Sequence, residues 1–138
     1  MRIFAMAGGL ALMASFTGGA VAADTKLGAM VENLARTKQA KADFQSMGTA
    51  LAMYKLNAGV YPTEKQGLAS LVEKPVVEPA PRRWIQIMKK IPKDPWGRDY
   101  RYIERKDNEQ EVHVLVSDGA EMDKTSDDIE FVLEKAGK

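Results

Sequence analysis

The sequence predicts an α+β domain, with a long N-terminal amphipathic helix packed on a small antiparallel sheet, a short second helix and a C-terminal acidic loop. Three observations predict this fold. Apolar residues recur with helical spacing between residues 27 and 54. Two β-rich runs, residues 100–103 and 112–116, flank a polar turn. The length of 138 residues, with 45% hydrophobic and 28% charged residues, fits one soluble globular domain.

The composition excludes several classes of protein. The chain has 20 Lys and Arg residues against 19 Asp and Glu residues, so no basic surface argues for nucleic acid or for an anionic membrane. The absence of cysteine excludes a disulfide framework and thiolate zinc sites, but it leaves the cellular compartment open. We therefore expect no nucleic-acid partner.

Residues 1–23 have the three regions of a secretory signal peptide. Arg2 supplies the positive charge, an apolar run follows from residue 3 to residue 16, and small residues end the segment. Two overlapping small-x-small sites predict a mature chain that begins at Ala23 or Asp24. The globular domain is then expected over residues 24–138.

An uncleaved N-terminal anchor is the alternative. The uncharged stretch over residues 3–23 just reaches the roughly 20 residues that span a bilayer, although its glycines make a weak span. The sequence therefore predicts a periplasmic or secreted protein that has no membrane contact once the signal peptide is cleaved. Retention of residues 3–23 would anchor it to the inner membrane.

A long helix is expected over residues 26–56. Its first apolar positions form a stripe at helical spacing, here called the apolar stripe: Leu27, Met30, Val31 and Leu34. The spacing resumes between residues 44 and 54, but only alanines lie between the two parts, so the first half should pack less deeply. At about 1.5 Å per residue, the helix exceeds what so small a domain can cover. The projecting apolar stripe is therefore a candidate contact surface.

Two turn motifs follow the helix. Thr63 and Gln66 have the spacing of a capping box, which predicts the start of a short second helix that ends before Pro75. Residues 94–97, Asp-Pro-Trp-Gly, have the residue types of a tight turn. We expect Trp96 in the core rather than on a ligand-binding surface, because large aromatic residues are mostly buried.

The remaining segments predict strands. Residues 100–103 and 112–116 form an antiparallel hairpin in this interpretation, while residues 129–133 fit either a third strand or the start of a terminal helix. The single histidine, His113, has no partner nucleophile and is expected to be structural. We find no phosphate loop, Ser-His-Asp set or HExxH motif, so we expect no enzyme, no catalytic residue and no organic cofactor.

An acidic loop lies between the last two apolar runs. Its five carboxylates fall within eleven residues: Asp118, Glu121, Asp123, Asp127 and Asp128. Such clusters suit Ca²⁺, which takes about six to eight oxygen ligands in irregular geometry. The spacing of an EF-hand is absent, and composition alone favours a solvated acidic turn.

These segments together resemble the periplasmic domain of the major pseudopilins of type II secretion systems, which have a type IV pilin-like fold. The resemblance is carried by KADFQSMGTALAMYKLNAGVYPTEKQGL at residues 41–68 and by DPWGRDY at residues 94–100. The motifs LVSDG and SDDI lie at the start and the end of the acidic loop, in the same order as in the family. The N-terminus differs, because it resembles a Sec-type signal peptide rather than a prepilin leader.

The resemblance implies a calcium site in the acidic loop. By analogy with the family, Asp118 and Asp127 would be the main side-chain ligands, and Leu115 and Thr125 would supply carbonyl oxygens. Asp128 would be a further ligand or a carboxylate just outside the ligand shell. Calcium would thus stabilise the loop.

The resemblance also implies a structural or assembly role in a type II protein secretion system. The expected partners are other pseudopilins or secretion-system proteins, and an oligomer is compatible with this role. A free periplasmic binding module that reuses the fold without filament assembly is the alternative, because a fold does not determine a function.

Overall fold

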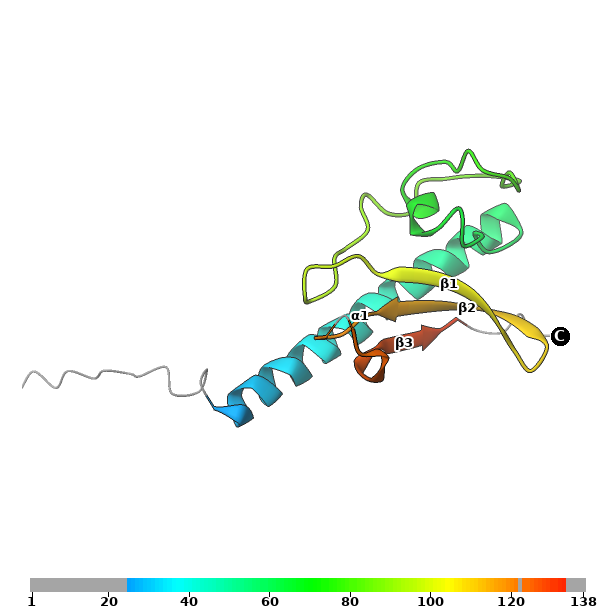
Figure 1. Cartoon of the computed structure of the whole chain (residues 1–138). Coiled ribbons are helices and arrows are strands. Elements are labelled where there is room, and N and C mark those ends of the chain that lie inside the picture. Colours follow the sequence, from blue (N-terminus) through cyan, green and yellow to red (C-terminus); the bar gives the residue numbers. More distant parts are fainter. Residues whose placement is uncertain (1–24, 122, 134–138) are drawn as a thin grey trace, which may run out of the picture.

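The computed structural model describes residues 25–121 and 123–133, so the predicted signal peptide lies outside the described residues. A long helix packs against a three-stranded antiparallel sheet (Figure 1). The elements in chain order are α1 (Lys26–Ala58), the 3-10 helix η1 (Leu68–Leu71), β1 (Arg101–Asp107), β2 (Gln110–Ser117), the 3-10 helix η2 (Thr125–Asp127) and β3 (Ile129–Val132). The predicted α+β fold is confirmed, and residues 129–132 form a strand. No helix within the described ranges combines the length and hydropathy of a membrane span.

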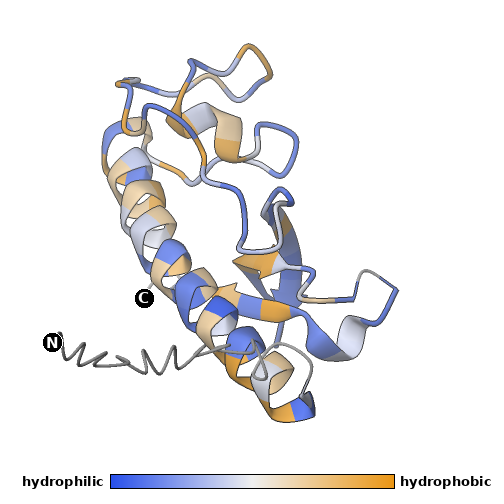
Figure 2. Cartoon of the chain, turned by 90° about the vertical axis from the view of Figure 1, so that its left-hand side faces the viewer, coloured by the Kyte–Doolittle hydropathy of each residue, from blue (hydrophilic) through white to orange (hydrophobic). Residues whose placement is uncertain are grey.

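Helix α1 has two different halves. The part from Ala40 onward supplies the buried residues, which are Ala40, Phe44, Met47, Ala50, Leu51, Tyr54 and Ala58. In its first half the apolar stripe is 57–69% exposed. The first turns extend past the sheet in Figure 1, and Figure 2 shows apolar residues on them. The predicted difference in packing depth is confirmed.

The ends of α1 follow known capping rules. The side chain of Thr25 accepts a hydrogen bond from the Gly28 amide at 3.1 Å. Gly59 closes the helix in the left-handed region, with φ of +94°, and its amide donates to the Lys55 carbonyl at 2.8 Å. The helix therefore ends two residues beyond the predicted residue 56.

The core lies between α1 and the sheet. The Phe44 ring packs against Tyr100 and Phe131, with ring centroids 5.2 and 6.0 Å away. Gly48 allows β3 to approach, because a Cβ at this position would lie 3.0 Å from the Phe131 ring. This contact fixes the helix against the strand that follows the acidic loop.

The predicted pair of hydrogen bonds between Thr63 and Gln66 forms, but it closes a turn that precedes the second helix, whose N-cap is Gly67 without a side-chain cap. The Gln66 amide donates to Thr63 Oγ1 at 3.2 Å, and the Thr63 amide donates to Gln66 Oε1 at 3.0 Å. The Gln66 side-chain amide also donates to the carbonyls of Val77 and Pro79. Gln66 thus holds the following loop, and the second helix is the short 3-10 helix η1, Leu68–Leu71.

The sheet register defines where a site can form. β2 is the central strand, and Arg101 of β1 lies opposite Val116, while Ser117 lies opposite Ile129 of β3. The start of β1, the end of β2 and the start of β3 therefore meet at one end of the sheet. The tight β1–β2 turn, where Asn108 has φ of +48°, lies at the other end.

Candidate functional site

The acidic loop leaves β2 after Ser117 and enters β3 at Ile129. These two residues pair across the strands, so the sheet holds the two ends of the loop together. Asp118 and Asp128 are the neighbouring residues, and the loop closes through the short helix η2. The first and last carboxylates of the loop are therefore brought to the same edge of the sheet.

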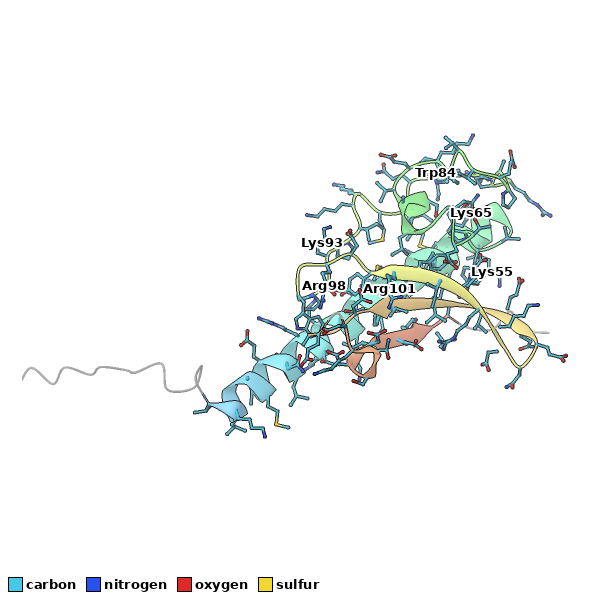
Figure 3. The ribbon with its side chains drawn as sticks, in the orientation of Figure 1. Lys55, Lys65, Trp84, Lys93, Arg98 and Arg101 are labelled. Carbon is cyan, nitrogen blue, oxygen red and sulfur yellow. The ribbon has the colours of Figure 1, made fainter. Side chains whose placement is uncertain are left out.

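Arg101 joins these two carboxylates. Its Nε and Nη2 atoms lie 2.7 and 2.6 Å from Asp118 Oδ1, and Nη2 lies 3.3 Å from Asp128 Oδ2. Figure 3 shows Arg101 at the end of the sheet where the loop begins. Sequence reasoning missed this residue, because its role depends on the strand register that places it opposite Val116.

Asp127 is held differently. Its Oδ2 atom accepts a hydrogen bond from the Glu121 amide at 2.9 Å, while its Oδ1 atom is buried and has no hydrogen-bond partner within residues 25–121 and 123–133. A buried acceptor that lacks a donor costs about 1–3 kcal/mol, and more when charged. Asp127 therefore offers an oxygen for a cation.

Gly119 makes room for Asp127. It has φ of +66°, and a Cβ built there would lie 2.4 Å from the Asp127 carbonyl oxygen and 2.9 Å from Asp127 Oδ2. Such contacts exclude any side chain at this position. The LVSDG motif therefore needs its glycine to bring the two sides of the loop together.

The two predicted carbonyl donors have different environments. Leu115 is buried in β2 between Tyr102 and Phe131 of the neighbouring strands. Thr125 is exposed in η2, and its carbonyl accepts a long hydrogen bond of 3.4 Å from the Asp128 amide. The Thr125 carbonyl thus lies within the loop itself, whereas Leu115 belongs to the sheet.

The donor set suits a hard cation but is not assembled around one. Over residues 25–121 and 123–133, no group of three or more His, Cys, Asp or Glu side chains is arranged to hold a metal ion. Arg101 holds Asp118 and Asp128, and the Glu121 amide holds Asp127. Oxygen ligands of this kind are those that calcium prefers, and Arg101 occupies one oxygen of Asp118 and one of Asp128.

A second loop supports the base of the acidic loop. Asp94 is buried, and it accepts hydrogen bonds from the amides of Trp96 and Arg98 at 3.0 and 2.7 Å and from Ser117 Oγ at 2.9 Å. Arg98 donates through Nη2 to the Gly119 carbonyl. The predicted tight turn is confirmed by the hydrogen bond from the Gly97 amide to the Asp94 carbonyl at 2.9 Å.

Trp96 and His113 have structural surroundings. Trp96 is half-buried and packs against the core, which is less burial than the sequence predicts. The His113 ring stacks on Tyr102, whose hydroxyl lies 2.9 Å from His113 Nδ1 and donates to the Pro62 carbonyl at 2.8 Å. Burial lowers the pKa of His113. The chemistry of this site lies in its carboxylates.

Comparisons with known proteins agree with this fold. The family model "Type II secretion system (T2SS), protein G" matches residues 29–133. The chain is 42% identical over 97 residues to a type II secretion system core protein G of Vibrio cholerae, covering 67% of this chain and 66% of that protein. It is 44% identical over 71 residues to the same protein of Pseudomonas aeruginosa, covering 50% of each. The chain thus spans half to about two thirds of these relatives.

A solved structure gives the same result. The major pseudopilin from the type 2 secretion system of enterohaemorrhagic Escherichia coli aligns with a TM-score of 0.65 at 32% identity, over 74% of this chain and 90% of that chain. The proteins matched are secretion-system core proteins and a pseudopilin rather than enzymes. Because the family model covers the helix, the sheet and the acidic loop, the chain belongs to the type II secretion system protein G family.

Proposed function

We propose that this chain is a structural, assembly component of a type II protein secretion system that works with other pseudopilins. The carrying observation is that the match to the protein G family starts at residue 29 and so includes most of the exposed apolar stripe as well as the acidic loop. The family match favours this role over a free periplasmic binding module.

The apolar stripe is the proposed contact surface. Its four side chains lie on successive turns of one part of α1, and they are 57–69% exposed. Each square ångström of apolar surface removed from water contributes roughly 25 cal/mol, so a partner that covers the stripe gains free energy. A neighbouring subunit with a similar apolar helix suits this surface.

Calcium is the proposed stabiliser of the acidic loop. Asp118 and Asp127 would supply carboxylate oxygens, Leu115 and Thr125 carbonyl oxygens, and Asp128 a further carboxylate. The ion supplies positive charge that offsets the repulsion among the carboxylates. The buried, unpartnered Oδ1 atom of Asp127 supports this proposal.

The proposed location is the cell envelope. A cleaved signal peptide would release the chain to the periplasm or the exterior, and a retained segment over residues 3–23 would anchor it to the inner membrane. Mass spectrometry of the exported protein tests this directly, since the mass shows whether the chain begins at Met1 or near Asp24. A retained Met1 contradicts cleavage.

The assembly role is tested with charged substitutions in the apolar stripe. Met30→Glu together with Leu34→Glu should leave the melting temperature nearly unchanged, because both side chains are exposed. The same variant should lose cross-linking to the other pseudopilins of its secretion system when expressed in the native host. Leu56→Glu is the matched control, since Leu56 lies on α1 outside the stripe and is 85% exposed.

Cross-linking of the stripe variant at the level of the unchanged protein would contradict the proposed contact surface. A mature chain that remains monomeric and contacts no secretion component would favour the free binding module instead.

A further inference from the structure

Arg101 is a built-in positive charge at the acidic loop. It is the first residue of β1, and no functional role follows from the sequence motifs. Its side chain is 47% exposed, whereas those of Asp118 and Asp128 are 23% and 17% exposed. The guanidinium therefore lies on the solvent side of two more deeply placed carboxylates.

Arg101 contacts carboxylates at both ends of the acidic loop. One nitrogen, Nη2, lies within 3.3 Å of an oxygen from each end of the loop. A guanidinium carries one positive charge and accepts no hydrogen bond, so it offsets part of the repulsion between the two carboxylates. Through these two carboxylates it links the end of β2 to the start of β3.

The neutralisation by Arg101 is incomplete. Asp127 has no contact with Arg101 among the described interactions, and its buried Oδ1 atom has no hydrogen-bond donor. Arg101 therefore contacts two of the three carboxylates, Asp118 and Asp128. A divalent ion with six to eight oxygen ligands, by contrast, can reach carboxylates and carbonyls together.

We propose that Arg101 is the internal counter-ion of the acidic loop, which holds the loop closed without metal and competes with calcium for Asp118 and Asp128. This inference rests on the calcium part of the proposed function. It follows that Arg101 lowers the calcium affinity of the loop while it preserves the fold when calcium is scarce.

The test compares Arg101→Gln with Arg105→Gln in the full-length chain. Arg105 lies four residues further along β1, on the same face, and its Nη1 atom forms an ion pair with Glu130 of β3 at 3.0 Å. The exposed fraction of its side chain, 43%, is close to that of Arg101. The control therefore removes a β1–β3 ion pair of the same kind outside the acidic loop.

Two measurements are made on each protein. Calorimetric titration with calcium after chelation should show that Arg101→Gln binds calcium at least about tenfold more tightly than the unchanged chain, which equals about 1.4 kcal/mol. The melting temperature in chelator should fall further for Arg101→Gln than for Arg105→Gln. Arg105→Gln should keep the calcium affinity of the unchanged chain.

Each outcome decides a separate point. Equal or weaker calcium binding by Arg101→Gln, in a chain that otherwise binds calcium, overturns the role of Arg101 and leaves the calcium site standing. An unchanged melting temperature of Arg101→Gln in chelator overturns the counter-ion role. Absence of calcium binding in all three proteins overturns both the competition and the calcium site, whereas the assembly role is tested by the cross-linking experiment.

Discussion

Two loops meet at the same end of the sheet, and both are built around aspartate side chains. In the tight turn over residues 94–97, the carboxylate of Asp94 is fully buried and accepts three hydrogen bonds from the protein. In the acidic loop, one oxygen of Asp127 is buried without a donor. The comparison teaches that the protein supplies its own donors to the Asp94 carboxylate, with the Arg98 guanidinium 3.9 Å away, but leaves one oxygen of Asp127 without a donor among the described residues.

The energies of the two arrangements differ. Hydrogen bonds to a charged group contribute about 1.5–3 kcal/mol each, whereas exposed ion pairs contribute about 0–1 kcal/mol. Asp94 depends on the former, while Asp118 and Asp128 depend on the half-exposed guanidinium of Arg101. We therefore expect the tight turn to be the rigid base and the acidic loop to be the part whose stability responds to cations.

The largest expected effect is at Asp94. Asp94→Ala removes the acceptor for the amides of Trp96 and Arg98 and for the Ser117 hydroxyl, so the free energy of unfolding should fall by about 4 kcal/mol. Urea denaturation in chelator and in calcium measures this loss. The loss should be similar in both, because Asp94 lies outside the proposed calcium ligands.

Asp99→Ala is the control for this substitution. Asp99 is 81% exposed and forms a surface ion pair with Lys93, so its removal should cost less than about 1 kcal/mol. Equal losses at Asp94 and Asp99 would remove the difference between a buried and an exposed carboxylate.

Trp96→Ala should have the next largest effect. Its ring is half-buried against the core beside the tight turn, so the loss should be about 2–3 kcal/mol, below the roughly 3–5 kcal/mol of a fully buried aromatic residue. Thermal unfolding measures it. A nearly silent substitution would show that the turn is held by the Asp94 hydrogen bonds without the ring.

Asp127→Asn sharpens the comparison further. The amide keeps an oxygen for the Glu121 amide and removes the uncompensated charge, so stability in chelator should change by less than about 1 kcal/mol. Urea denaturation of this variant beside Asp94→Ala is the measurement. A loss as large as that of Asp94→Ala would mean that the Asp127 carboxylate is already satisfied without a cation.

The smallest effect is expected in the middle of β2, at His113. Burial lowers its pKa in the folded state, although Glu104 and Glu111 oppose the shift. The unfolded chain therefore binds more protons as the pH falls through about 6.5, and the free energy of unfolding decreases in that range.

The contribution of His113 is complete above its unfolded pKa and is lost on acidification. His113→Gln should remove the contribution of His113 to the slope of the unfolding free energy against pH, measured between about pH 8 and about pH 6. An identical slope in the variant would assign the pH dependence to other groups.

Local patterns predicted the elements, while contacts across the sheet escaped them. The helical spacing and the hydrogen-bonded pair of Thr63 and Gln66 each act within a few residues, and the structure confirms both. Arg101 could not be found this way, because its contact with Asp118 depends on the register of β1 against β2. Register is set by the whole sheet and its turns.

The candidate site shows the same limit. The carboxylates of the acidic loop were visible as a cluster in the sequence, but which of them are satisfied was not. The hydrogen bond from Ser117 Oγ to Asp94 Oδ2 joins residues 23 positions apart. It gives the tight turn over residues 94–97 a donor of the kind that Asp127 Oδ1 lacks. Whether a carboxylate finds hydrogen-bond donors depends on three-dimensional packing rather than on local spacing in the sequence.

The most direct test of this difference compares melting temperatures in chelator and in millimolar calcium. Three proteins are measured: the unchanged chain, the single variant Asp94→Ala, and the double variant Asp118→Ala/Asp127→Ala. Ligand linkage predicts that calcium raises the melting temperature of the first two proteins and leaves that of the double variant unchanged. A calcium response that persists in the double variant, or that is absent from the unchanged chain, would contradict the account.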